Sequence, residues 1–324
     1  MGKIRIGVIG CASIAKRLML PAINAMPDYM ELVAVASRTK DKADEFSALF
    51  DCDGVVGYDR LLSRQDIDAV YIPLPTGLHK EWIVKALSNG KHVYAEKSIA
   101  MNEHEAREMV ELAKSRGLAL MEGYMFQYHT QHKVVKQILA DGVLGTPRLI
   151  RASFGFPPFL DSENFRYDNQ IGGGALKDAA GYVLRCVNFL FDNTFTVKAS
   201  NVYYDSSCTS IYGTVFLTAG SELSAEISFG FDNYYQCNYE IWGSLGKLTC
   251  IKAFTPKPNE ETHVLIEKQG FKDDIAIPPF NHFASAMKEF CQICENKDLR
   301  DKHYNDIVFQ SNGLDIIEKL SKHS

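Results

Sequence analysis

The fold follows from the stretch Lys3-Ile-Arg-Ile-Gly-Val-Ile-Gly-Cys-Ala-Ser-Ile-Ala15, near the start of the chain. The β-branched run that ends at Ile9 predicts a short buried strand. The residues from Gly10 onward predict a tight turn and a helix that begins near Ser13. Backbone N–H groups and the positive end of the helix dipole meet at such a point, so the stretch predicts a phosphate-binding turn.

This turn matches the dinucleotide fingerprint G-x-G-x-x-G/A with one substitution, because Ala12 holds the place of the second glycine. The methyl group of Ala12 stands where the backbone should approach a pyrophosphate, so the loop must lie further out or be shaped differently. An ordinary strand-to-helix turn is the alternative. The candidate cofactor contacts in the turn are Gly10, Cys11, Ala12, Ser13 and Ile14.

A second parallel strand is expected at Glu31–Ser37, with the preceding helix, interrupted at Pro21, as the crossover. In NAD-binding folds this strand usually ends in an acid that holds the ribose 2′-hydroxyl. Here the residues are Ser37, Arg38 and Thr39. A hydroxyl followed by a guanidinium suits a 2′-phosphate, since it supplies a forked donor and no repulsive carboxylate. We therefore expect NADP(H) to be preferred, with NAD(H) possible.

Strands and helices alternate up to about residue 122, which predicts an α/β domain with a doubly wound parallel sheet. The expected strands are 69–72, 92–95 and 118–121, and the expected helices are 78–88 and 103–115, the last capped by Asn102 and Glu105. The residues Pro73 and Leu74 follow the third strand and are candidate cofactor contacts. His79 could cap a helix or line the cofactor crevice.

A charged pair, Glu96-Lys97, follows directly after the apolar run His92–Ala95. Ligands of open α/β sheets bind outside the carboxyl ends of the strands, so Lys97 is placed for a site. A solvated surface lysine is the alternative. We expect Glu96 and Lys97 to contact the cofactor.

Beyond about residue 123 the chain changes to consecutive strand patterns of period two, which predict an α+β domain on a largely antiparallel open sheet. The sequence therefore predicts domains at 1–122 and 123–324. The expected strands are 149–156, 197–204, 211–217, 223–229, 234–242 and 263–267, and the expected helices are 131–141, 174–191, 281–295 and 304–320.

The run Gly172-Gly-Gly-Ala-Leu-Lys-Asp-Ala-Ala-Gly-Tyr182 opens one of these helices. Three glycines let the chain enter at close approach to a neighbour. Asp178 and Tyr182 are four residues apart, so they share one helical face. An acid and a phenol aimed into a cleft could handle a proton. The alternative is an acid that favours the helix dipole beside a half-buried core tyrosine.

Composition excludes several classes of function. The chain has 324 residues, 46% of them apolar, and its 35 basic and 40 acidic residues give a formal charge of −5. This balance does not support binding to nucleic acid or to a membrane surface. The chain carries no signal-peptide pattern and no long apolar run, so a cytoplasmic protein is expected. The eight cysteines suit reduced thiols, and Cys291 and Cys294 lack the partners of a metal site, so no metal is expected.

The chain resembles the Gfo/Idh/MocA oxidoreductase family over essentially its whole length. The resemblance rests on the order and spacing of the glycine turn, the Glu96-Lys97 pair and the run from Gly172 to Tyr182. It implies a Rossmann domain, an α+β domain whose open sheet often mediates oligomers, and NAD(P)-dependent chemistry on sugars and related compounds. It also implies that Lys97, Asp178 and Tyr182 match the motif lysine, the helix acid and the acid/base of the family. Ser98 departs from the family, because a proline usually follows the lysine.

The form Gly-Cys-Ala-x-Ile-Ala is similar to a branch of the family that reduces nucleotide-linked keto-deoxysugars. The runs Phe154–Pro158 and Phe165–Tyr167 are similar to the same branch. Arg166 could pair with a diphosphate, and an aromatic ring nearby could stack on a base or sugar. A proline-stiffened surface loop is the alternative. The candidate substrate-binding residues are Phe156, Phe165, Arg166 and Asp178.

The leading hypothesis is an NADPH-dependent ketoreductase that acts on a sugar or nucleotide-sugar. In it, Tyr182 gives a proton to the developing alkoxide and Lys97 lowers the pKa of the phenol, while Asp178 holds the lysine or the substrate. Which of Lys97 and Tyr182 is the direct donor stays open. The second hypothesis is a dehydrogenase of a free polyol, aldose or dihydrodiol. The third is a non-catalytic dinucleotide sensor, which the retained proton donor disfavours.

The exposed face of the second sheet is expected to be rich in tyrosine and to form a homodimer or homotetramer. Tyrosine is also common on solvated strands, which is the alternative. The tyrosines concerned are Tyr203, Tyr204, Tyr234, Tyr235 and Tyr239.

Overall fold

The computed structural model describes residues 2–161, 164–192 and 194–321. The chain forms two compact units, the first made of residues 1–123 and 283–308 and the second of residues 124–282 and 309–324. The sequence predicts that residues 283–308 belong to the second domain. The structure groups this segment with the first unit, because Tyr304 and Ile307 join its apolar core.

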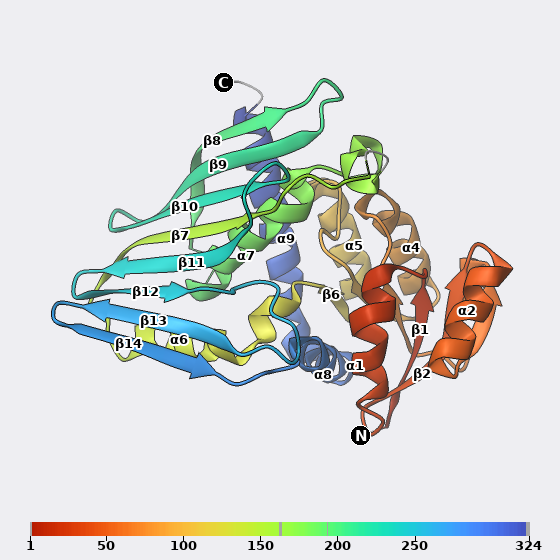
Figure 1. Ribbon diagram of the computed structural model, residues 1–324. Helices are drawn as coiled ribbons and strands as arrows, with labels where there is room; N and C mark the ends of the chain where they lie inside the picture. The colour runs from red at the N-terminus through yellow and green to blue at the C-terminus, as the bar shows by residue number, and fades with distance from the viewer. Residues whose placement is uncertain (1, 162–163, 193, 322–324) are drawn as a thin grey trace. The chain divides into compact units, whose positions relative to one another are not determined.

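The first unit is built on a six-stranded sheet in the order β3-β2-β1-β4-β5-β6 (Figure 1). All neighbouring strands are parallel. The predicted doubly wound parallel sheet is therefore confirmed. The strands are β1 (Ile4–Ile9), β2 (Met30–Ser37), β3 (Asp53–Val56), β4 (Ala69–Ile72), β5 (His92–Ala95) and β6 (Leu120–Glu122).

One strand of this sheet was not predicted. β3 is a four-residue edge strand, and its burial pattern shows only Val55 partly buried. Because most of β3 is exposed, it carries no apolar run from which a strand could be recognised.

The helices that group wholly or partly with this unit include a five-residue π segment, η1, which leads into α1. The predicted interruption at Pro21 is wrong, because the chain stays helical through that residue. The π turn places the N–H of Leu20 on the carbonyl of Ala15, and the wider turn accommodates a proline that has no N–H. The helical segments are η1 (Ala15–Met19), α1 (Leu20–Asn24), α2 (Lys40–Phe50), α3 (Tyr58–Leu62), α4 (Thr76–Ser88), α5 (Glu103–Arg116), α8 (His282–Glu295), η6 (Lys297–Leu299) and α9 (Arg300–Ser321).

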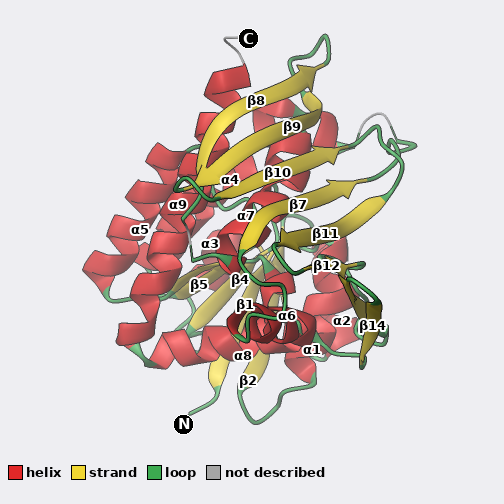
Figure 2. Ribbon diagram, turned by 90° about the vertical axis from the view of Figure 1, so that its left-hand side faces the viewer, coloured by secondary structure: helices red, strands yellow, loops and turns green. Residues whose placement is uncertain are grey.

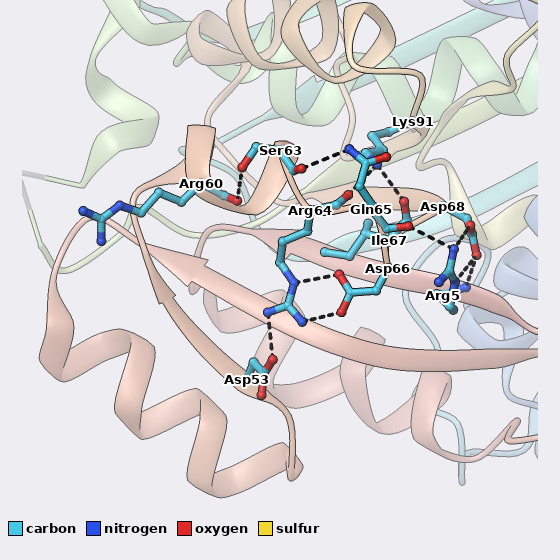
Figure 3. Close-up of polar contacts among 10 residues, drawn as sticks. All are labelled: Arg5, Asp53, Arg60, Ser63, Arg64, Gln65, Asp66, Ile67, Asp68 and Lys91. Carbon is cyan, nitrogen blue, oxygen red and sulfur yellow. Dashed lines mark hydrogen bonds and ion pairs between the residues drawn. The ribbon is translucent and has the colours of Figure 1, made fainter.

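Polar contacts tie together the amino ends of the strands in this unit, as Figure 3 shows. The guanidinium of Arg5 lies 2.7 Å from the carboxylate of Asp68. The buried Lys91 ammonium donates to the carbonyls of Arg64 and Ile67 at 2.7 and 2.8 Å. These groups satisfy one another at this end of the sheet, whereas the predicted binding residues follow the carboxyl ends of the strands.

The second unit is built on an eight-stranded sheet in the order β14-β13-β12-β11-β7-β10-β9-β8. Only β7 and β10 are parallel among the paired neighbours of this sheet, so the predicted largely antiparallel arrangement is confirmed. The strands are β7 (Pro147–Gly155), β8 (Thr196–Tyr204), β9 (Ser210–Ala219), β10 (Leu223–Gly230), β11 (Gln236–Gly243), β12 (Gly246–Cys250), β13 (Thr262–Lys268) and β14 (Phe271–Ile277).

The strands β12 and β14 were not predicted. β12 has five residues and begins at a glycine, and β14 carries Lys272, Asp273 and Asp274 in its centre. A strand that is short or carries charged residues shows no clear alternation of apolar and polar residues, so it is not recognised from the sequence. Charges are nevertheless suited to β14, since it forms one edge of the sheet.

The helix α7 packs on β7 and β10, and Figure 2 looks onto the sheet, where β8, β9, β10, β7 and β11 follow one another. Tyr203, Tyr212 and Trp242 are exposed on these strands. The expectation that Tyr239 is exposed is wrong, because it is fully buried and its hydroxyl lies 3.0 Å from Nδ1 of His132. The remaining helical segments of the unit are η2 (Met125–Tyr128), α6 (Thr130–Ala140), η3 (Phe165–Tyr167), η4 (Asn169–Ile171), η5 (Leu176–Ala180) and α7 (Gly181–Leu190).

Candidate active site

The glycine turn after β1 has the backbone that the sequence predicts. Gly10 has a φ of +116°, and a Cβ added to it would lie 2.8 Å from Cδ2 of Leu74. Its N–H donates to the carbonyl of Ala36 at 3.0 Å, which holds the turn against β2. The helix then begins at Ser13. A glycine is therefore required here both by the dihedral angle and by the close approach of Leu74.

The end of β2 presents a hydroxyl and a guanidinium side by side in the chain. Ser37 is buried, and its hydroxyl oxygen accepts the N–H of Thr39 at 3.3 Å, so its own proton can still be donated. Arg38 is exposed. These two residue types suit a phosphate better than a free ribose hydroxyl.

The segment that carries Lys97 is held on both sides. Before it, the hydroxyl of Tyr71 donates to the carboxylate of Glu96 at 2.8 Å. After it, the N–H of Ile99 donates to the carboxylate of Glu122 at 2.8 Å, and the Lys97–Ser98 peptide bond is cis. Sequence reasoning missed Tyr71 and Glu122, although both lie in or beside predicted strands. Lys97 itself is partly buried.

His79 connects two loops at the carboxyl ends of the strands. Its Nδ1 lies 2.9 Å from the carbonyl oxygen of Ser98, and its Nε2 lies 2.7 Å from that of Leu74. The ring is fully buried, and this burial lowers the pKa of His79 to about 4. Of the two roles that the sequence leaves open for His79, the helix cap does not apply, because Pro75 holds the N-cap position of α4. His79 therefore links the loop after β4 to the loop after β5.

In the second unit, the glycine run closes tightly on its neighbours. Gly174 has a φ of +101°, and a Cβ there would lie 2.5 Å from Oγ of Ser210. A Cβ at Gly173 would lie 2.6 Å from the carbonyl oxygen of Arg166. Ser210 in turn accepts the N–H of Leu176 at the start of η5, at 2.9 Å. The glycines thus allow the loop and β9 to support the first turn of the acid-bearing helix.

Asp178, on η5, pairs with an arginine from the loop before it. Nε of Arg166 donates to its carboxylate at 2.7 Å. The guanidinium also lies over the rings of Phe159 and Phe165, at 5.0 and 4.6 Å from their centroids. Phe165 is 45% exposed, whereas Phe156 is partly buried and stacks on Phe231 with its ring centroid 5.1 Å away. Sequence reasoning named Arg166 and Asp178 separately and did not predict their pairing.

Tyr182 lies one turn further along, in α7. Only 6% of it is exposed, and its hydroxyl donates to the sulfur of Met125 at 3.8 Å. Its ring contacts those of Tyr124 and Phe154, with centroids 5.6 and 4.9 Å away. Aromatic rings thus pack around the Tyr182 ring on more than one side. Because so little of Tyr182 is exposed, a ligand could contact only a small part of its side chain.

The cysteines of the C-x-x-C pair show no sign of metal binding or redox use. Cys291 and Cys294 are buried free thiols, and burial raises the pKa of Cys291 to about 11. Within the residues that the structure describes, no group of three or more histidine, cysteine or acidic side chains is arranged to hold a metal. In the same described ranges, no helix has both the length and the apolar character that crossing a bilayer requires.

A parallel sheet with a glycine turn after its first strand, and a second unit whose helix carries an acid and a phenol, are features of dinucleotide-dependent oxidoreductases. Family models agree with this class. Residues 4–124 match the oxidoreductase family with an NAD-binding Rossmann fold, and residues 132–249 match the Gfo/Idh/MocA C-terminal domain. The chain belongs to the Gfo/Idh/MocA family of oxidoreductases.

Two curated relatives are named dTDP-3,4-didehydro-2,6-dideoxy-α-D-glucose 3-reductase. The protein from Saccharopolyspora spinosa is 41% identical over 89% of this chain and 87% of its own length. The protein from Actinomadura kijaniata is 40% identical over 97% of this chain and 94% of its own length.

The solved structure of KijD10, a 3-ketoreductase from Actinomadura kijaniata, contains NADP and TDP-benzene. It superimposes with a TM-score of 0.94 and is 36% identical, with 98% of each chain covered. Variants of KijD10 with a lysine replaced by alanine or a tyrosine replaced by phenylalanine have also been solved, with TM-scores of 0.91 and 0.94 to this chain.

Proposed function

We propose that this chain reduces a ketone on a nucleotide-linked deoxysugar with NADPH. The observation that carries the proposal is the Arg166–Asp178 pair, which places a cation and the exposed ring of Phe165 beside the acid-bearing helix. A guanidinium and an aromatic face are what a diphosphate and a base require. The relatives named above support this class of substrate, since their names specify dTDP-linked keto-deoxysugars.

The residues of the first unit fit the dinucleotide. Gly10 supplies the positive φ that the turn requires, and Ser37 and Arg38 would hold a 2′-phosphate. When bound, the reduced nicotinamide supplies a hydride to the carbonyl carbon. NADP in the KijD10 structures supports the preference for NADP(H) over NAD(H).

In our proposal, the chain's own side chains manage the proton. As the carbonyl oxygen gains negative charge, Tyr182 donates its phenolic proton to it. Lys97 donates a hydrogen bond to the same oxygen and, by its charge, makes the phenol a stronger acid. Asp178, held by Arg166, orients the substrate. The lysine and tyrosine variants of KijD10 support the choice of these two residue types.

Calorimetric titration tests this proposal directly. The protein would be titrated with NADPH and with NADH, each with and without dTDP. We expect tight NADPH binding, weaker NADH binding, and dTDP binding that disappears in Arg166→Gln. Arg148→Gln, an exposed arginine at the start of β7, is the control and should bind dTDP normally.

Two other results would overturn parts of the proposal. Binding of a dinucleotide without any binding of dTDP would favour a dehydrogenase of a free polyol, aldose or dihydrodiol. Binding of neither dinucleotide would mean that Ala12 disables the turn, and the enzymatic proposal would fail.

We also propose that the chain acts in the cytoplasm as a homodimer or homotetramer. The exposed Tyr203, Tyr212, Phe216 and Trp242 on the second sheet support an interface there. Tyr203 and Tyr212 stack with their ring centroids 5.0 Å apart, which makes a flat aromatic surface of the kind that interfaces use.

A further inference from the structure

Tyr58 lies beside the phosphate-binding turn, and the sequence patterns did not single it out. We propose that its hydroxyl donates a hydrogen bond to the 2′-phosphate of NADPH. This inference rests on the proposed use of NADPH and adds a third donor to Ser37 and Arg38. It assigns to Tyr58 a share of the preference for NADPH over NADH.

The backbone places Tyr58 next to the end of β2. It is the first residue of α3, directly after Gly57. The N–H of Gly57 donates to the carbonyl of Ser37 at 2.9 Å, which joins the residue after β3 to the last residue of β2. Gly57 has a φ of +96°, so the chain can turn sharply at this contact and start the helix.

The side chain of Tyr58 reaches from this point toward the glycine turn. A Cβ added to Gly10 would lie 3.9 Å from Oη of Tyr58, so the hydroxyl borders the turn. Burial raises the pKa of the Tyr58 phenol, and the positive charge of Arg38 opposes this effect. The phenol of Tyr58 therefore stays protonated and can donate a hydrogen bond. It also lies close enough to Arg38 to interact with its charge, and Arg38 would bind the same phosphate.

The ring is held without using its hydroxyl. It packs edge-on against Trp82, with centroids 4.9 Å apart and planes at 89°. Trp82 is itself fixed by Lys85, whose ammonium lies 4.1 Å from the centre of the indole ring. None of the residues that the structure describes forms a hydrogen bond with Oη of Tyr58. A positioned donor that its own protein leaves unused, beside a cation, suits an anionic ligand.

The chemistry of the 2′-phosphate fits three convergent donors. A phosphate presents three acceptor oxygens at this position, and bonds to it are charge-assisted. Arg38 offers a fork, Ser37 offers a hydroxyl whose proton is not used in its bond from Thr39, and Tyr58 offers a phenol. Loss of one hydrogen bond to a charged group weakens binding by about tenfold or more.

The experiment compares the wild-type chain with Tyr58→Phe, which keeps the ring packed on Trp82 and removes only the hydroxyl. Calorimetry would measure the Kd of 2′,5′-ADP, 5′-ADP, NADPH and NADH. We expect Tyr58→Phe to weaken 2′,5′-ADP and NADPH by about tenfold and to leave 5′-ADP and NADH unchanged. Tyr29→Phe, just before the amino end of β2, is the matched control and should bind all four normally.

Other outcomes overturn the inference. Equal weakening of all four ligands would place the hydroxyl on another part of the nucleotide, and unchanged NADPH binding would remove it from the site. A wild-type chain that binds 2′,5′-ADP no better than 5′-ADP would refute the NADPH preference itself. If the wild-type chain prefers NADPH and Tyr58→Phe weakens only 2′,5′-ADP and NADPH, the inference is supported. This outcome does not depend on whether the proposed sugar substrate is the right one.

Discussion

Lys97 owes its placement to contacts made by its neighbours in the chain. Glu96 is bonded to Tyr71 and Ile99 is bonded to Glu122, so the backbone that carries the lysine is held from two strands. Tyr182 is placed in a different way, by aromatic packing around a nearly buried ring. The segment around Lys97 is therefore held by polar contacts, whereas Tyr182 is held by packing.

Replacing either Lys97 or Tyr182 should reduce turnover and leave cofactor binding intact. We expect Lys97→Ala and Tyr182→Phe each to lower kcat by at least about tenfold, because a positioned acid contributes two to four decades of rate. Steady-state kinetics with a dTDP-linked keto-sugar gives kcat, and calorimetry with NADPH gives Kd. Lys80→Ala, in an exposed ion pair with Glu108, is the control. Near-normal kcat in either variant would take that residue out of the mechanism.

At the scale of elements, the start of the acid-bearing helix depends on a backbone that only glycine allows. Gly174 combines a positive φ with a close approach to Ser210, while Ser210 caps the N–H of Leu176. The π segment η5 then carries Asp178 before the helix becomes regular at Gly181. The glycine loop, strand β9 and the helix that carries Asp178 thus contact and support one another.

Gly174→Ala should damage both stability and activity. Its Cβ would meet Oγ of Ser210 at 2.5 Å, in addition to the strain of φ +101°. Gly220→Ala is a matched control, since Gly220 has a φ of +64° with nothing within 4 Å of an added Cβ. We expect the control to lose about 1 kcal/mol and Gly174→Ala to lose more, together with dTDP binding. Urea unfolding and calorimetry measure the two effects, and equal losses would contradict this account.

His79 couples two loops and should make the first unit sensitive to acid. Its pKa falls from 6.5 when unfolded to about 4 when buried, so the unfolded chain binds the extra proton. Its contribution is complete above pH 6.5 and decreases as the pH falls toward 4, by about 2 kcal/mol at pH 5.

Urea unfolding followed between pH 7 and pH 5 measures this dependence. We expect the wild-type chain to be less stable at pH 5 than at pH 7. His79→Gln, whose side chain does not titrate, should be less stable overall but should lose less stability on acidification. His104→Gln, which replaces an exposed histidine, should keep the wild-type dependence. An unchanged pH dependence in His79→Gln would show that other groups cause it.

At the scale of the whole molecule, the second sheet has one face that helix α7 covers and an opposite face that α7 leaves open. Trp242 and Phe216 are exposed there, on strands that lie in the middle and toward one end of the sheet. A large exposed aromatic surface on a sheet is more typical of an interface than of a solvated face.

We expect the wild-type chain to form a dimer or tetramer in light scattering at micromolar concentration. Trp242→Glu should shift it toward the monomer, because a buried unpaired carboxylate is costly at an interface. Leu49→Glu is the control, since Leu49 on α2 has the same 52% exposure as Trp242 but lies outside the sheet. A monomeric wild-type chain would dispose of the proposed assembly.

Comparison of sequence with structure shows which signals are local. The glycine turn, the helix cap at Asn102 and the run of period-two strands were predicted, because each depends on neighbours within a few residues. The cap is confirmed by the side chain of Asn102, which accepts the N–H of Glu105 at 2.9 Å. The missed strands β3, β12 and β14 are short or charged, so none of them shows an apolar alternation pattern of its own. β12 and β14 nevertheless pair with the strands directly before them in the chain, β11 and β13.

The sequence by itself determined the class of fold. It also predicted a phosphate-binding turn, a preference for NADP(H) at Ser37 and Arg38, and Lys97, Asp178 and Tyr182 as candidate site residues. These follow from residue type and spacing along the chain. Only the tertiary structure decided that Arg166 pairs with Asp178, that His79 joins two loops and that the hydroxyl of Tyr58 borders the glycine turn. The reason is physical, because such contacts join segments whose separation in space is set by sheet order and loop closure.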